Sequence, residues 1–175
     1  MSIDIDNRHP KLRVGQARLA KHLRGVLREV GRGRAHVDVS LVTDREIRKL
    51  NKQFRGVDAV TDVLSFALTE GEGPPLPGDW LGDVVVSLDT ARRQAAQMQS
   101  VQMQARTIAA DPTAARAWRL TEEVMFLATH GVLHLVGHDH EDPAEAEVME
   151  ALERKLLLAV TPLDVHGLDR TTHGR

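Results

Sequence analysis

The amino-acid sequence predicts a single α/β domain in which helices cover a small mixed sheet. Short apolar segments of strand length alternate along the chain with longer segments in which apolar residues recur with helical spacing. A length of 175 residues is typical of one domain and is sufficient to bury a sizeable core. The hydrophobic content of 42% and the charged content of 27% are those of an ordinary globular protein.

The first third of the chain predicts two strands, each followed by a helix. Ile3–Ile5 alternates apolar and acidic residues, which indicates a short edge strand. Lys11 to about Val30 carries an apolar stripe with helical spacing, and the glycines of Gly31–Gly33 end that helix. Ala35–Val42 alternates again and predicts a second strand. A helix capped at its start follows at about Thr43–Phe54.

A loop, two strands and a turn are predicted for the middle of the chain. Arg55–Asp62 is polar and is expected to form a loop. Val63–Leu68 is an apolar segment of strand length. Gly71–Gly78 is rich in Gly and Pro, which predicts a turn or a mobile loop. Leu81–Leu88 is the most apolar of the strands, so we expect it to be the most buried.

The last part of the chain predicts three helices. The first runs over about Thr90–Ala105, and Asp111–Pro112 breaks it. The second opens at Thr121–Glu123 and is apolar nearly all the way round, as expected of a buried helix. The third starts at Asp142–Glu145, where Asp, Pro and Glu occupy favoured starting positions. Its predicted inner face consists of Val148, Leu152 and Leu156. From residue 161 onward we expect a flexible, polar tail.

Three histidines at i, i+4 and i+10 are the most informative feature of the chain. His130 and His134 share one helical face, with Cβ atoms about 6 Å apart, so both can bind one ion. Gly137 can adopt the left-handed conformation that ends a helix, and His140 can then return as a third ligand. Three neutral imidazoles leave one position open for water, which is the arrangement of a catalytic zinc site. Zinc is the expected ion, with nickel or another borderline metal as the alternative.

The same spacing occurs in metzincin proteases, which read H-E-x-x-H-x-x-G-x-x-H. This chain has Gly131 where those proteases carry the glutamate that acts as general base. Glu141, beside the third histidine, is the residue that could substitute for it. A single histidine of this kind would more often be a core residue whose ring nitrogens are hydrogen-bonded. All three at ligand spacing favour a metal site.

The segment His130–His140 resembles the signature of the YbeY family, metal-dependent endoribonucleases that mature ribosomal RNA. Two further blocks agree in content and order. Asn51–Phe66 contains Thr-Asp-Val-Leu-Ser-Phe, similar to the family segment T-[DN]-V-L-S-F, and Leu81–Ser87 is similar to its L-G-D-I-x-I-[CS] strand. The resemblance covers about residues 35–158. It implies a four-stranded sheet with about five helices, a family-like domain over residues 1–160 and a tail at 161–175.

The chain departs from the family pattern at three places. His138 stands where the family most often has Tyr, which adds a fourth imidazole or an acid–base group. Ala67 stands where Pro is usual. A stretch at about residues 102–118 is expected to be an insertion before the histidine helix. None of these departures touches the three expected ligands.

The resemblance also assigns roles to individual residues. Arg55 matches an arginine that serves the substrate phosphate, and a guanidinium suits phosphate geometry, so we expect it to be catalytic and substrate-binding together with catalytic His134. Asp139 is expected to accept an N–H from a ligand histidine, and Ser65 to contact substrate. Three residues of the matching blocks are expected either to line the cleft or to cap strands, and these are Thr61, Asp62 and Asp83.

Charge and composition bear on partners and location. Residues 1–58 carry 14 Lys and Arg against 7 Asp and Glu, whereas residues 59–175 carry 9 against 18. This basic first third fits a polyanion-binding surface or a solvated helix with paired charges. The N-terminus lacks the pattern of a signal peptide, no segment is long and apolar enough to span a membrane, and cysteine is absent. We therefore expect a cytoplasmic protein with no membrane partner.

Three hypotheses follow for the function. The leading one is a zinc-dependent endoribonuclease that cleaves single-stranded ribosomal RNA in 16S rRNA 3′ end maturation and ribosome quality control, with the 30S subunit and its associated factors as partners. The second is a zinc protease, against which the glycine at position 131 counts. The third is a non-enzymatic ribosome-assembly factor with a structural zinc, in which His138 or Glu141 fills the fourth position.

Overall fold

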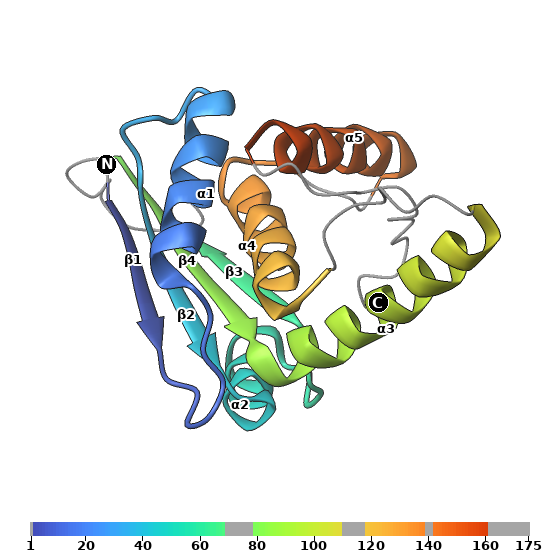
Figure 1. Ribbon diagram of the computed structural model, residues 1–175. Coiled ribbons are helices and arrows are strands. Elements are labelled where there is room, and N and C mark those ends of the chain that lie inside the picture. Colours follow the sequence, from blue (N-terminus) through green and yellow to red (C-terminus); the bar gives the residue numbers. More distant parts are fainter. Residues whose placement is uncertain (1, 69–78, 110–117, 139–141, 161–175) are drawn as a thin grey trace.

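The computed structural model describes residues 2–68, 79–109, 118–138 and 142–160 (Figure 1). The elements in these ranges follow in the order β1 (Ser2–Asn7), α1 (Gln16–Glu29), β2 (His36–Val42), α2 (Asp44–Arg55), β3 (Val63–Ala67), β4 (Trp80–Ser87), α3 (Leu88–Ala109), α4 (Leu120–Leu135) and α5 (Pro143–Val160). The turn expected at Gly71–Gly78, most of the insertion and the tail lie outside the described residues.

The four strands form one mixed sheet in the order β1-β2-β4-β3. β1, β2 and β4 are parallel, and β3 pairs antiparallel with β4 as an edge strand. The prediction of an α/β domain with a mixed four-stranded sheet and five helices is confirmed. The central strand β4 is largely buried because helices cover the sheet on both faces.

Alternation along the strands divides the core between the two faces of the sheet. Val37, Val39 and Leu41 of β2 face the larger cluster, to which α1 and α4 contribute their apolar residues. α1 and α4 lie side by side over this face, and α5 packs across both (Figure 1). α2 covers the other face, where Ile47 packs against Leu64 and its neighbours in a smaller cluster.

Two helix starts differ from the sequence-based expectation. The first helix begins at Gln16 rather than Lys11, because the His9 ring organises a loop before it: its Nδ1 accepts the backbone N–H groups of Lys11 and Leu12. The third begins at Leu88 and continues to Ala109, past the expected end at Ala105. Within the described residues, no helix is long and apolar enough to cross a bilayer.

α4 is the most buried helix of the described chain, as its all-round apolar sequence predicts. Its first turn places two carboxylates in the core: Glu123 accepts a hydrogen bond, whereas Glu122 has an ion-pair partner but accepts no hydrogen bond from a described residue. Arg18 of α1 lies 2.8 Å from Glu122, and the indole Nε1 of Trp118 donates to Glu123 over 2.6 Å. These partners compensate part of the cost of burying two charges.

Gly131 sets how closely α4 approaches the sheet. A Cβ atom built on Gly131 would lie 2.7 Å from Cγ1 of Val84 on β4 and 3.4 Å from Cγ2 of Val63 on β3. Real Cβ contacts essentially never fall below 3.0 Å. Position 131 is therefore glycine because the sheet occupies the space that a side chain would need.

Gly131→Ala is expected to lower the free energy of unfolding by about 1–3 kcal/mol through overpacking, more than the gain of about 1 kcal/mol in helix propensity. Adding Val84→Ala makes room for the new methyl group. The double variant should therefore lose less stability than the two single variants together, measured by urea unfolding followed by circular dichroism. Strictly additive losses would contradict the close approach.

Candidate functional site

His130 and His134 lie on the side of α4 that faces α5. Their Nε2 atoms are 3.0 Å apart, and their rings meet edge to face with centroids 4.6 Å apart. His130 is buried and His134 is partly exposed. The i, i+4 spacing therefore brings both imidazoles to one place, as the sequence predicts, with the more exposed ring on the solvent side.

Glu153 of α5 holds the other side of His130. Its Oε1 lies 2.6 Å from Nδ1 of His130, and both side chains are buried. The proton on Nδ1 of a neutral His130 donates to this carboxylate, which leaves a lone pair on Nε2. That lone pair accepts the Nε2–H of His134, so one choice of tautomers satisfies both contacts. Carboxylates orient metal-ligating histidines in this way in many zinc proteins.

The pair fits a zinc ion in donor type and spacing. Zn–N bonds of about 2.0–2.1 Å in tetrahedral geometry place two ligand nitrogens about 3.3 Å apart, close to the 3.0 Å found here. A site with an open position also needs a third protein ligand. Within the described ranges, no group of three His, Cys, Asp or Glu side chains is placed to hold an ion. Asp139, His140 and Glu141 lie outside those ranges, so the expected third ligand and its neighbours stay predictions.

Gly137 ends α4 in the left-handed conformation that the sequence predicts, with φ of +93°. The N–H of His138 donates to the carbonyl of Leu133, and that of Gly137 to the carbonyl of His134. These two bonds are those of a Schellman motif, which turns the chain away from the helix axis. The chain thus leaves α4 at the turn that precedes the expected third ligand.

The position of Gly131 also bears on the protease hypothesis. The direction of its missing Cβ is toward Val84 and Val63 on the sheet, away from the face that carries His130. A glutamate at position 131 would meet the sheet before it could reach the histidine pair. The arrangement of α4 is therefore incompatible with a metzincin-type base at this position.

The structure places Arg55 and Ser65 on opposite faces of the sheet. Arg55 is the exposed last residue of α2 rather than part of a loop, and α2 packs on the face opposite α4. Ser65 pairs with Val84 and so faces the α4 side of edge strand β3. The described contacts do not bring Arg55 to the histidine pair.

The other residues of the matching blocks have structural partners. Asp62 accepts the backbone N–H of Val63 and an N–H of Gln94, so it caps the start of β3. Asp83 lies in register with Asp38 on the face away from α4, where burial and the carboxylates of Asp83 and Asp4 raise the pKa of Asp38. Asp83 therefore does not lie on the α4 side with the histidines.

Sequence reasoning missed Glu153 because the predicted inner face of α5 was centred on Val148 rather than Met149. Leu156 is buried and Leu152 packs against the core as expected, but Val148 is 60% exposed, and Met149, Glu153 and Leu157 are buried instead. A signal was present: Glu153 lies four residues after Met149 and three before Leu156, so an acidic residue interrupts an apolar stripe. A buried carboxylate needs a partner, which here is His130, an expected metal ligand.

Comparisons with known proteins agree with the sequence blocks. The sequence model of the family described as Endoribonuclease YbeY matches residues 4–161. The Endoribonuclease YbeY of Anaeromyxobacter sp. strain Fw109-5 is 42% identical over 159 residues, which are 91% of this chain and 72% of that protein. The Endoribonuclease YbeY of Thermus thermophilus is 39% identical over 140 residues, covering 80% of this chain and 87% of that protein. The solution structure of TM1509 from Thermotoga maritima has a TM-score of 0.51 at 28% identity, covering 90% of this chain and 88% of that one.

His22 of α1 is buried against Thr129 of α4, and its protonation affects the stability of the fold. The hydroxyl of Thr129 donates to the carbonyl of Met125, so its oxygen accepts Nε2–H of His22, 2.8 Å away. Burial, together with the charge of Arg18, lowers the pKa of His22 from 6.5 to about 4. Between these two values the unfolded chain binds a proton at this site that the folded chain does not.

Stability should therefore fall as the pH drops from about 6.5 to about 4, by roughly 3 kcal/mol for His22 alone. His22→Gln keeps a hydrogen-bonding side chain but does not titrate. We expect the difference in unfolding free energy between wild type and His22→Gln, measured by urea unfolding across this range, to shrink or reverse toward low pH. A difference independent of pH would show that His22 is not held neutral.

Proposed function

This chain belongs to the YbeY endoribonuclease family, and from that premise we propose that it hydrolyses phosphodiester bonds in single-stranded ribosomal RNA with the help of one zinc ion. The observation that carries the proposal is the pair of Nε2 atoms of His130 and His134 at 3.0 Å, with Glu153 behind one of them. His140 is the proposed third ligand, and Asp139 the residue that orients the ligands from the adjoining segment.

The roles of this chain's residues follow from the geometry. A bound zinc ion would supply an activated water at neutral pH and polarise a phosphoryl oxygen. Glu153 holds the Nδ1 proton of His130, so the Nε2 lone pair of His130 is directed toward His134. His134 would hold the ion through Nε2, with its proton on Nδ1, since its Nε2 lies 3.0 Å from that of His130.

We propose that Arg55 binds a phosphate of the RNA strand rather than the ion. Its guanidinium is exposed, and it forms no ion pair with any residue in the described ranges. The residues after it are firmly held: Gly56 takes a left-handed conformation, and Asp58 is bound by both Arg48 and Lys52. An RNA strand that passes around the edge of β3 would contact Arg55 on one side of the sheet and Ser65 on the other.

The substrate and cellular context are part of the proposal. The 3′ end of 16S ribosomal RNA is the proposed substrate, and the 30S subunit with its associated factors the proposed partner, in the cytoplasm. The excess of basic residues over positions 1–58 supports an RNA partner, since phosphate contacts supply most of the affinity in such complexes.

His134→Ala should remove bound zinc. Loss of a residue that only orients a metal ligand typically costs about 10–100-fold, so loss of the ligand itself should lower RNA cleavage by more than that. Arg55→Glu should keep the zinc but lose cleavage, because it places a negative charge where phosphate binds. Both are measured on purified protein, with zinc determined by elemental analysis and cleavage on structured ribosomal RNA.

Cleavage that is unchanged in both variants, with zinc still bound, would point to a contaminating nuclease. The non-enzymatic hypothesis, in which the ion has a closed set of protein ligands, would then replace the endoribonuclease.

Glu153→Gln should weaken zinc binding by about tenfold, at the lower end of the range for outer partners, because the amide still accepts a hydrogen bond but lacks the charge. Glu150→Gln is the matched control, since Glu150 is on the same helix but exposed. Competition with a chromogenic chelator measures both. Equal affinities in the two variants would remove Glu153 from the site.

A further inference from the structure

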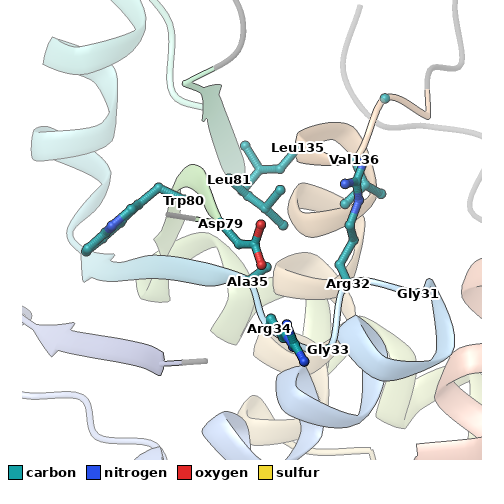
Figure 2. Close-up of a pocket in the computed structure, with 11 residues that line it drawn as sticks. Gly31, Arg32, Gly33, Arg34, Ala35, Asp79, Trp80, Leu81, Leu135 and Val136 are labelled. Carbon is teal, nitrogen blue, oxygen red and sulfur yellow. The ribbon is translucent and has the colours of Figure 1, made fainter. Parts of the chain in front are cut away.

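A cavity of about 610 Å³ opens beside the last turn of α4 (Figure 2). Three segments line it: residues 31–35 between α1 and β2, the start of β4 at Asp79–Leu81, and Leu135–Gly137 at the end of α4. Its volume lies in the range of about 300–1,000 Å³ that is usual for small-molecule sites. Among the described residues, none of those assigned above to the ion or to substrate takes part in the lining.

The lining combines an apolar wall with two arginines, Arg32 and Arg34, and one carboxylate, Asp79. Leu81, Leu135 and Val136 form the wall. Figure 2 shows Arg32 extending toward Val136 and the carboxylate of Asp79 directed into the space between the three segments. Neither Arg32 nor Asp79 forms an ion pair with any other residue that the structure describes. Such a cavity suits a ligand that carries an anionic group, an apolar surface and hydrogen-bond donors.

The backbone of Arg32 is fixed in place. Gly31 has φ of +73° and its N–H donates to the carbonyl of Arg28, while the N–H of Arg32 donates to the carbonyl of Leu27 over 2.7 Å. This is a second Schellman motif, at the end of α1. The carbonyl of Arg32 in turn accepts the N–H of Ala35. Because the backbone of Arg32 is already ordered, only its side chain loses freedom when the guanidinium binds an anion, which limits the entropy lost.

Electrostatics decide how a ligand would lie. The carbonyl ends of α1 and α4 carry partial negative charge, and Asp79 adds a full one, so the interior disfavours an anion. Arg32 is exposed and lies at the rim. A phosphate is therefore favoured at Arg32, and a neutral part with N–H or O–H donors is favoured inside, toward Asp79.

We propose that this cavity binds one nucleotide of the RNA strand beside the cleavage site, with its phosphate on Arg32 and its nucleoside against the apolar wall. A nucleoside carries the N–H and O–H donors that Asp79 can accept. The wall also adjoins the ion-binding segment: Leu135 follows His134 directly, and Gly137 is within one helical turn of it, about 5.4 Å along the axis. The inference rests on the proposed function, since it takes RNA as the ligand.

The test compares two arginines at the end of α1. Arg28, in the last turn of α1, is also exposed but does not line the cavity. Arg32→Ala and Arg28→Ala therefore remove the same charge from neighbouring places on the surface. Binding of a fluorescently labelled single-stranded RNA of about twelve nucleotides to the intact chain is measured by anisotropy at several salt concentrations. Cleavage of ribosomal RNA and thermal unfolding are measured on the same samples.

Arg32→Ala should raise Kd about fivefold to tenfold and reduce the slope of log Kd against log salt by about 0.7, the loss of one phosphate contact to a single strand. Arg28→Ala should stay within about twofold of wild type. If both variants have equal effects while the wild type binds and cleaves RNA, the cavity is not a nucleotide site, and the proposed function stands. Weaker binding in Arg32→Ala alone, with no cleavage by wild type, would keep the cavity and overturn the endoribonuclease. A wild type that does not bind RNA would overturn both.

Discussion

The close approach of α4 to the sheet at Gly131 is the constraint on which the rest of the structure depends. Because no side chain separates the helix from Val84, the helix is fixed in rotation as well as in distance. With position 131 facing the sheet, His130 and His134 face α5. The same contact places Leu135 and Val136 beside the starts of β2 and β4. One missing Cβ atom thus sets the orientation of both the histidine pair and the cavity.

The histidine pair also depends on α5. A buried imidazole can take either tautomer, and its neighbours decide which one it adopts. The contact of Glu153 with Nδ1 of His130 favours one tautomer, at the cost of burying a carboxylate. Stability alone would favour a hydrophobic residue at this position of the otherwise apolar stripe of α5. The contact with His130 accounts for the acidic residue that stands there.

Two helices end in the same way around the cavity. Gly31 and Gly137 both take positive φ, and both helix ends have the paired hydrogen bonds of a Schellman motif. At the end of α1 this geometry presents Arg32, and at the end of α4 it turns the chain toward the expected third ligand. Rigid backbone therefore holds both sides of the region where we place the RNA strand, as precise positioning of a phosphate requires.

The sequence by itself determined what depends on local spacing. The i, i+4 histidines, the left-handed Gly137, the buried character of α4, the succession of strands and helices and the family all follow from patterns within a few residues, because helix and strand periodicity fix which neighbours share a face. The tertiary structure alone decided what joins distant segments. Glu153 meets His130 across 23 positions, Gly131 meets Val84, and Arg55 lies on the other face of the sheet from the histidines. No local pattern encodes these contacts, because they arise only when whole helices pack against the sheet and against each other.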